Sequence, residues 1–220
     1  MSPVLFDEKV APFYESWFDT PEGHQADRRE KALLGRMLAL LGPAGTLLEV
    51  GCGTGHFARW LAQGGWRVVG LDHSLAMLDE ARARGGRPLI LGDALALPFP
   101  DRSFDVVALL TVLEFLPEPR AALAEAWRVA RRGLLLGVLN RVSPIAWMRR
   151  IAGRFRPNLY NAARFYSPRE LARLVRETAG RPLTLEWGTT LWPRGLPLEG
   201  GPLPGGAFIA LAAREEQSDG

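Results

Sequence analysis

The chain has 220 residues, of which 47% are hydrophobic and 23% are charged. This composition is typical of a globular protein with a sizeable core, and no apolar run approaches the roughly 18 residues that would indicate a membrane span. Its one cysteine excludes an internal disulfide and a cysteine-rich metal site. Because the first residues lack the basic start and apolar centre of a signal peptide, we expect a cytoplasmic protein. We also expect no metal, and one domain over residues 1–214 followed by a tail at 215–220.

The net charge of +3 is distributed unevenly. Residues 141–169 contain seven arginines and no aspartate or glutamate, so the rest of the chain carries a net negative charge. This asymmetry favours a local role for the arginines over a generally basic surface.

Residues 1–45 are predicted to form an N-terminal helical cap that ends at the Gly-Pro pair. Its expected buried positions are Trp17, Phe18, Leu33, Leu34, Met37, Leu38 and Leu41.

Residues 46–139 alternate short apolar runs with amphipathic stretches. The predicted strands lie at 46–50, 67–71, 88–91, 104–110 and 133–139, and the predicted helices near 54–63, 74–84 and 119–131. Near-continuous apolar strands indicate a sheet covered on both faces, and strand–helix alternation indicates parallel βαβ units. The fold class is therefore α/β, with a doubly wound sheet.

After residue 139 the pattern changes. Residues 140–168 are basic and aromatic without a clear strand, and we interpret them as a lid. A capped helix follows, with Ser167 as N-cap, Pro168 at N1, Glu170 at N3 and Gly180 at its end. Residues 183–192 and 207–214 read as two closing strands, which complete a segment of helix and strands over 169–214.

The stretch LLEVGCGTG places three glycines directly after the first predicted strand. A tight glycine turn between a strand and a helix is where an open parallel sheet receives a nucleotide-like ligand. Gly51 and Gly53 would let the backbone approach the ligand, and Gly55 would let the helix pack closely against the strand. Taken alone, such a turn is also compatible with a merely tight connection.

Two carboxylates follow the neighbouring strands. Asp72 ends the second strand and is suited to a ribose diol, while Asp93 follows the third and lies within reach of an adenine edge. Either aspartate alone would also suit a helix cap or a turn. Because the carboxyl ends of parallel strands lie side by side, both should line one crevice with the glycines.

The spacing of the glycines argues against a nicotinamide cofactor. The turn reads G-x-G-x-G rather than G-x-G-x-x-G, and the lysine of a phosphate-binding loop is absent. Glu49 lies one residue before Val50, where a buried acid would repel a pyrophosphate but tolerate an ammonium and a sulfonium. These features favour S-adenosylmethionine.

Over roughly residues 45–140 the sequence resembles the class I S-adenosylmethionine-dependent methyltransferases, and within them the methyltransferase type 11 group. Four segments carry the resemblance: LLEVGCGTG, GLDHSLAMLDEAR, GDALALPFPDRSFDVV and LLTVLEFLPEP. It implies a Rossmann-like sheet of seven strands, mostly parallel with the last strand antiparallel, and helices on both faces. It also implies S-adenosyl-L-methionine as cofactor and S-adenosyl-L-homocysteine as product.

The resemblance assigns roles to positions in the four segments. Asp72 would bind the ribose hydroxyls, with His73 and Met77 beside the adenine. Asp93 would hold the adenine amino group, supported by the backbone of Ala94. The glycines and Thr111 would lie at the methionine end of the cofactor.

The chain departs from the family at two places. Phe115 stands where members often have a histidine, and VARRGL replaces the L-x-P-G-G segment before the fifth strand, which we expect to alter only a turn. Glu114 is a candidate general base, with a structural carboxylate as the alternative. Methyl transfer needs no visible catalytic residue, because alignment of the reactants supplies much of the acceleration, and we assign none.

Several other residues have two readings. Tyr14 and Trp17 would either cover the cofactor or pack within the helical cap. Cys52 is interpreted as a small packing residue rather than a reactive thiol. His24 and His56 have no ligand pattern around them and are interpreted as surface or helix residues.

The predicted lid would face the methyl acceptor. Within it, Arg149, Arg150, Arg154 and Arg156 alternate with Trp147, Met148, Ile151 and Phe155. Such a mixture suits a small acceptor carrying a carboxylate or phosphate, or a lipid-like acceptor met at an anionic membrane surface; a solvated helix face is the alternative. The predicted function is methyl transfer to a small molecule, with an RNA methyltransferase and a non-catalytic cofactor-binding protein as alternatives.

Overall fold

The computed structural model describes residues 8, 10–86, 88–143, 163–191 and 203–216. Its helices are the 3-10 helix η1 (Ala11–Trp17) and the α-helices α1 (Pro21–Ala39), α2 (His56–Gln63), α3 (Leu75–Ala83), α4 (Pro119–Val129) and α6 (Pro168–Ala179). Its strands are β1 (Thr46–Val50), β2 (Arg67–Asp72), β3 (Leu89–Leu91), β4 (Phe104–Leu110), β5 (Ala130–Leu139), β6 (Leu183–Thr190) and β7 (Phe208–Glu215).

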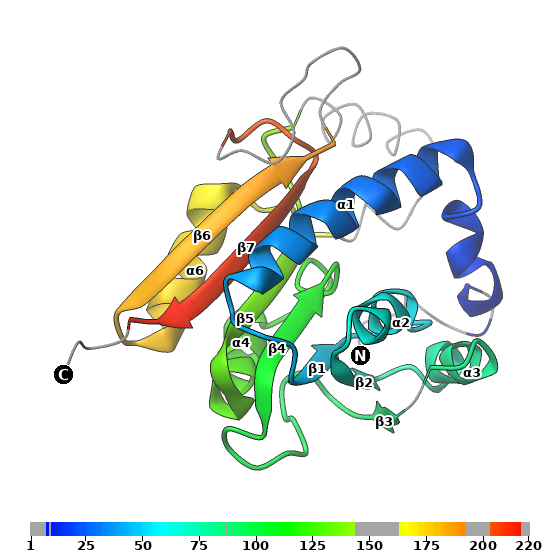
Figure 1. The fold of residues 1–220 in the computed structure, drawn as a ribbon, viewed down its shortest axis with the longest axis horizontal. Helices are drawn as coiled ribbons and strands as arrows, with labels where there is room; N and C mark the ends of the chain where they lie inside the picture. Colours follow the sequence, from blue (N-terminus) through cyan, green and yellow to red (C-terminus); the bar gives the residue numbers. More distant parts are fainter. Residues whose placement is uncertain (1–7, 9, 87, 144–162, 192–202, 217–220) are drawn as a thin grey trace.

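The strands form one seven-stranded sheet in the order β3-β2-β1-β4-β5-β7-β6 (Figure 1). Strands β1 to β5 are parallel to one another, and β7 runs antiparallel to both β5 and β6. The predicted fold, a mostly parallel doubly wound sheet with an antiparallel last strand, is confirmed.

Register places the ends of the central strands side by side. Val50 pairs with Leu71 of β2 and with Leu109 of β4. The residues that follow, Gly51 after β1 and Asp72 at the end of β2, therefore lie next to each other at one edge of the sheet. This alignment is what parallel pairing predicts for the glycine turn and the first aspartate.

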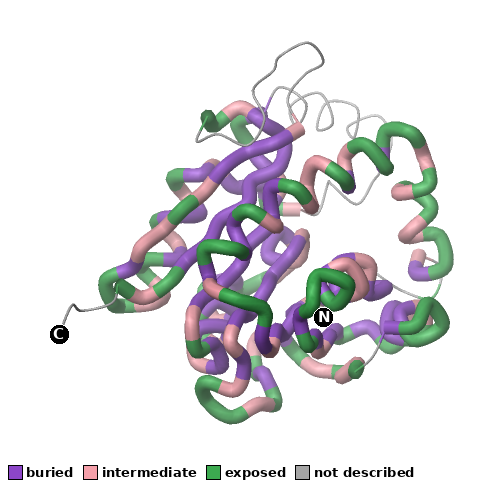
Figure 2. Tube along the Cα trace, viewed as in Figure 1, coloured by how far each residue is buried: buried purple, intermediate pink, exposed green. Residues whose placement is uncertain are grey.

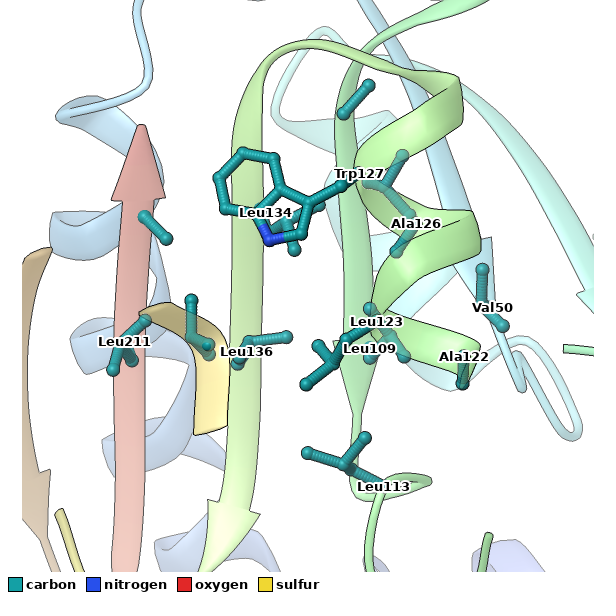
Figure 3. Packing of buried hydrophobic residues seen from close by; sticks show 14 of the residues in the cluster. Val50, Leu109, Leu113, Ala122, Leu123, Ala126, Trp127, Leu134, Leu136 and Leu211 are labelled. Atoms are coloured by element: carbon teal, nitrogen blue, oxygen red, sulfur yellow. The ribbon is translucent and has the colours of Figure 1, made fainter. Parts of the chain in front are cut away.

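Helices cover both faces of the sheet, as the apolar strands predicted. On one face α4 and α6 contribute to a core cluster that includes Leu109, Leu134 and Trp127, and Figure 3 shows these side chains packed between α4 and the strands. On the other face α1 and α2 pack Leu34 and Leu61 into a second cluster. Figure 2 shows that the central strands are buried along most of their length, whereas η1 and the outer side of α1 are exposed.

The beginning of α6 agrees with its sequence signals. The Ser167 hydroxyl accepts a hydrogen bond from the Glu170 backbone N–H (3.3 Å), and the Glu170 carboxylate accepts one from the Ser167 backbone N–H (2.9 Å). Gly180 ends the helix with φ of 63°. This capping box satisfies N–H groups that a helix start leaves without partners.

Predictions for two places in the chain need correction. Trp17 lies on η1 with 43% of its surface exposed, so it is not a core residue. Helix α4 ends at Val129 and β5 begins at Ala130 without an intervening turn, because Ala130 already pairs with Phe104 of β4. The replaced segment before the fifth strand thus removes the turn rather than altering it.

The predicted lid lies mostly outside the described residues, which resume at residue 163. Near its end Tyr166 forms a parallel bridge with Asn140, and its hydroxyl donates to the Leu113 carbonyl (3.3 Å). No helix in the described part of the chain is long and apolar enough to cross a membrane.

Candidate functional site

A cavity of about 980 Å³ lies at the carboxyl ends of β1, β2 and β4, with η1 and the first turns of α1 forming one wall. Of the residues predicted to bind a cofactor, all but Gly55 line it: Tyr14, Glu49, Gly51, Gly53, Asp72, His73, Met77, Asp93, Ala94 and Thr111. The tertiary structure thus brings together residues that lie between positions 14 and 111 of the sequence.

The glycine turn has the conformation that its sequence requires. Gly51 and Gly53 have φ values of 72° and 52°, a region that residues with a side chain rarely adopt. A Cβ on Gly51 would meet Cγ2 of Val112 at 2.3 Å, whereas a Cβ on Gly53 would have nothing within 4 Å. Gly51 therefore permits close packing against the loop after β4, and Gly53 leaves open space.

Gly55 acts differently from the prediction. It is the N-cap of α2, and a Cβ there would lie 3.3 Å from the Cβ of Ala81. Its small size therefore allows α2 to approach helix α3, not the strand. Helix contacts of this kind depend on the tertiary arrangement, which the local sequence does not show.

Asp72 joins the end of β2 to the glycine turn. Its Oδ2 accepts a hydrogen bond from the Gly53 backbone N–H (2.8 Å), and its Oδ1 accepts one from the Ser74 backbone N–H (2.9 Å). A carboxylate offers about four acceptor positions, so capacity remains for a diol. His73 lies 3.4 Å from Oδ1, and its hydrogen bond to Asp72 raises the pKa of the imidazole.

The residues predicted to lie beside the adenine differ in their exposure. Met77 and Ala94 are buried, with 2% and 8% of their surfaces exposed. Asp93 is exposed, and its Oδ1 accepts a hydrogen bond from the Leu95 backbone N–H (2.9 Å). This bond is the turn role that the sequence left open for Asp93, and its Oδ2 remains available.

Glu49 is the most unusual acid of the cavity. It is buried with 1% of its surface exposed, and its Oε2 has no hydrogen-bond partner among the described residues. Burial, with the neighbouring charge of Asp72, raises the pKa of Glu49 to about 8. A buried carboxylate oxygen without a donor is costly, so a ligand that brings an ammonium group fits this position.

Thr111 is held in a strained backbone conformation at the end of β4. Its φ is 52°, and its N–H donates to the Gly137 carbonyl of β5 (2.8 Å). Strain of this kind persists where the surrounding structure imposes it, often at functional sites. The bond to β5 fixes the loop that carries Val112 and Phe115 into the cavity lining.

The positions of Glu114 and Cys52 favour a structural carboxylate and a packing residue over a general base and a reactive thiol. Glu114 does not line the cavity; its Oε1 accepts a hydrogen bond from the Leu139 N–H (2.7 Å) and so ties β5 to the loop after β4. Burial raises the pKa of Glu114 to about 7. Cys52 is buried, and burial together with the carboxylates of Glu49 and Asp72 raises the pKa of its thiol well above its usual range, which keeps it in the unreactive thiol form.

The aromatic wall formed by η1 is attached to the glycine turn. Tyr14 and Trp17 line the cavity, which favours the covering role over core packing. Between them Glu15 accepts two hydrogen bonds from Nη2 of Arg59 (2.8 and 2.9 Å), and Nη1 of Arg59 donates to the Thr54 carbonyl (2.7 Å). The position of the wall is therefore coupled to the turn.

Sequence reasoning missed His56. Its side chain lines the cavity and is only 16% exposed; Nε2 lies 2.6 Å from Oδ1 of Asp27, and the ring stacks on Phe18 with centroids 3.8 Å apart. His24, by contrast, is exposed on α1 as expected. His56 and Asp27 are 29 positions apart in the chain, so no local sequence pattern predicts their contact.

The cavity is acidic in its described part. Glu30, Glu49, Asp72 and Asp93 line it, and no arginine or lysine does so among the described residues. Those residues also contain no group of three or more side chains that could hold a metal ion.

Comparisons with known proteins agree with this geometry. A family profile described as a methyltransferase domain matches residues 48–136. An uncharacterized protein of Methanocaldococcus jannaschii is 33% identical over 175 residues, which cover 79% of each chain. The chain belongs to the class I S-adenosylmethionine-dependent methyltransferases. The enzyme therefore uses S-adenosylmethionine, which supplies an electrophilic methyl group on a sulfonium when bound.

Other relatives show the range within this family. A demethylmenaquinone methyltransferase of Renibacterium salmoninarum is 39% identical over 133 residues, which cover 59% of this chain and 54% of that protein. A solved structure described as a SAM-dependent methyltransferase, possible histamine N-methyltransferase, from Thermotoga maritima is 28% identical with a TM-score of 0.75, covering 96% of this chain and 99% of that one. Magnesium protoporphyrin IX methyltransferase from Synechocystis, solved with bound S-adenosylhomocysteine, shares the fold at 21% identity and a TM-score of 0.62, covering 88% and 84%.

Proposed function

We propose that this methyltransferase acts on a small acceptor with an apolar or aromatic body and a nucleophile that is an amine or a phenol, where an amine that binds as an ammonium loses a proton before it attacks. The observation that carries the proposal is the cavity lining, which combines aromatic side chains with carboxylates and contains no described arginine or lysine. Ligand sites are typically apolar with a few placed polar groups.

The cofactor would occupy the part of the cavity above β1 to β3. The unpartnered oxygen of Glu49 suits its ammonium group, and Asp72 suits the ribose diol. Met77 and Asp93 would contact the adenine. Thr111 would lie near the methionine end, close to the glycine turn.

The acceptor would then occupy the remaining part of the cavity. Its lining is apolar and comes from the ends of β4, β5 and β6, from the start of α2 and from the aromatic wall. These residues include Phe18, Phe57, Leu110, Val112, Phe115, Leu139 and Leu191. Phe115 belongs to this end, so the family position that often holds a histidine here presents an apolar face instead.

The charge of the site bears on the nucleophile. Glu30 is the lining carboxylate that the cofactor is not proposed to use. A carboxylate in a partly desolvated cavity favours cations and disfavours anions, which supports an amine or a neutral phenol over the carboxylate or phosphate acceptor that the arginines of residues 147–156 suggested. Those arginines lie outside the described residues. The same acidic lining gives no support to an RNA substrate, whose phosphates require basic partners.

The relatives offer supporting examples. The Thermotoga protein is described as a possible histamine N-methyltransferase, and histamine is an aromatic amine. The Renibacterium relative is a demethylmenaquinone methyltransferase. Both names are compatible with an acceptor that has a ring and a modest size.

The test uses cofactor labelled on its methyl group and a panel of histamine, tryptamine, catechol, 4-nitrophenol, benzoate and total RNA. We expect label in the amines or phenols. Label only in benzoate or RNA, or in none of the panel, would overturn the proposal. Trp17→Ala should raise the KM for the acceptor about tenfold through lost aromatic contact, whereas Leu40→Ala is the matched control, since both residues are 43% exposed but only Trp17 lines the cavity.

A further inference from the structure

A charged cluster on α1 meets the first residue of α2 at the cavity. Asp27 is buried with 8% of its surface exposed. Its Oδ1 lies 2.6 Å from Nε2 of His56, and its Oδ2 accepts a hydrogen bond from Nζ of Lys31 (2.8 Å). Lys31 also lies 3.0 Å from Nε2. None of these three side chains has a role in the proposed function.

Two aromatic rings hold the imidazole of His56 in one plane. Phe18 stacks on it with an interplanar angle of 2°, and Phe57 meets it edge to face with centroids 5.3 Å apart. The hydrogen bond to Asp27 fixes the remaining rotation of the ring. A side chain that is fixed in three ways at a cavity wall is positioned in advance, which is what a catalytic group requires.

The short contact also decides where the proton of the neutral ring lies. Nε2 lies 2.6 Å from Oδ1 of Asp27 and 3.0 Å from Nζ of Lys31. Lys31 already donates to Oδ2 of Asp27, and the shorter contact, with an ionised Asp27, places the ring hydrogen on Nε2 and leaves Nδ1 as the acceptor nitrogen. The hydrogen-bond contacts printed for the imidazole among the described residues, to Asp27 and Lys31, are both at Nε2, and the residue lines the cavity. A base oriented by a carboxylate through its other nitrogen is the arrangement of catalytic His–Asp pairs.

We propose that His56 is the general base that takes the proton of the methyl acceptor, and that Asp27 is its positioning residue. The acceptor O–H or N–H bond breaks and its proton passes to Nδ1. The acceptor's electron pair forms the bond to the methyl carbon, and the pair of the broken methyl–sulfur bond stays on sulfur. The proposal rests on the proposed function, because only an acceptor with a proton to lose needs a base.

Other charged groups lie on the elements around this ring. Lys31 and Glu30 are on α1, Arg59 is on α2, and Glu15 is on η1. Arg59 and Glu15 are paired with each other, and Lys31 is paired with Asp27. Any pH dependence assigned to His56 must therefore be separated from theirs by substitution.

The first test measures proton transfer without methyl transfer. The probe is 4-nitrophenol, whose phenolate absorbs visible light, added to enzyme filled with S-adenosylhomocysteine so that no sulfonium charge assists ionisation. Binding to the wild type should increase the phenolate absorbance. His56→Gln should bind the probe without this increase, and His24→Gln, altered on the exposed face of α1, should behave as the wild type. Failure of the probe to bind, or an increase that persists in His56→Gln, would overturn the proposal.

The second test addresses Asp27. Long-range ¹H–¹⁵N NMR spectra of the wild type should show His56 with its hydrogen on Nε2. Asp27→Asn should populate the other tautomer and lower the phenolate signal, and Asp27→Glu should restore part of both. A merely structural role for Asp27 would change neither the tautomer nor the absorbance in a variant that still folds.

The third test separates the base from a cofactor ligand. With an acceptor from the panel, His56→Gln should lower kcat about 100-fold, as loss of a general base does, and remove the acid limb of its pH profile while the Kd for S-adenosylhomocysteine stays within about twofold. A tenfold weaker Kd with an unchanged pH profile would show that His56 holds the cofactor instead. If the panel shows no turnover but the probe and NMR results hold, the acceptor class fails and the base stands.

Discussion

Replacement of Glu49 by glutamine tests the buried acid that the cofactor is proposed to meet. Burial raises the pKa of Glu49 to about 8, so about nine-tenths of the free enzyme carries a protonated carboxyl at pH 7. An ammonium beside the carboxylate favours its charged form. Binding of S-adenosylhomocysteine at pH 7 should therefore release about 0.9 proton, and affinity should rise about tenfold from pH 6 to pH 7.

Isothermal titration calorimetry measures this release directly. The binding heat is compared in phosphate and Tris at pH 7, because the two buffers differ in their heat of protonation. Glu49→Gln should show equal heats in both buffers and an affinity that does not change from pH 6 to pH 7. His73→Gln is the control, because the pKa of His73 is also raised. This variant should keep the proton release that Glu49→Gln loses. Proton release that survives in Glu49→Gln, or its absence in the wild type, would refute the assignment.

The same residue predicts a stability effect in the free enzyme. The pKa of Glu49 is raised in the folded state from its usual 4.5 to about 8, so folding retains a proton that the unfolded chain loses between these values. Stability should therefore fall as pH rises from about 5 to 8. Glu49→Gln has no carboxyl to deprotonate and so does not lose stability in this way. Its thermal midpoint should exceed that of the wild type at pH 8 but not at pH 5.

Four further substitutions probe the residues that shape the site. Asp72→Asn should weaken S-adenosylhomocysteine binding at least about tenfold in calorimetry, because an amide cannot accept on both sides as a carboxylate does; unchanged affinity would place the cofactor elsewhere. Gly51→Ala should cost about 1–3 kcal/mol in urea unfolding, since its Cβ would meet Val112 at 2.3 Å, and Gly53→Ala, with nothing within 4 Å, should cost less. Glu114→Gln should leave the pH profile of turnover unchanged; loss of the acid limb there would make Glu114 the base.

Much of the fold follows from local sequence signals. Apolar runs of strand length separated by amphipathic stretches predict a parallel sheet because such strands are buried on both faces, and the seven strands lie where those runs are. Ser167 and Glu170 set the start of α6 through hydrogen bonds between residues three positions apart. The glycines of the turn were predicted for the same reason, since left-handed φ values at Gly51 and Gly53 are a property of the residue type itself.

Some residues of the site could be predicted from the sequence, and others are recognised only in the tertiary structure. The glycine turn, Asp72 and Asp93 were found because parallel topology brings the carboxyl ends of neighbouring strands together, a rule that needs only the order of elements. The pairing of His56 with Asp27, the approach of Gly55 to Ala81 and the exposure of Trp17 depend on how α1, α2, α3 and η1 pack against one another.

Helix packing is decided by the shapes of whole surfaces, and residues 29 positions apart have no periodic relation that a single sequence displays. The sequence by itself therefore determined the sheet, the cofactor class and the edge of the sheet at which the cofactor is proposed to bind. Only the tertiary structure decided which polar groups line the part of the cavity proposed for the acceptor, because those groups come from helices whose relative positions the strand pattern leaves free.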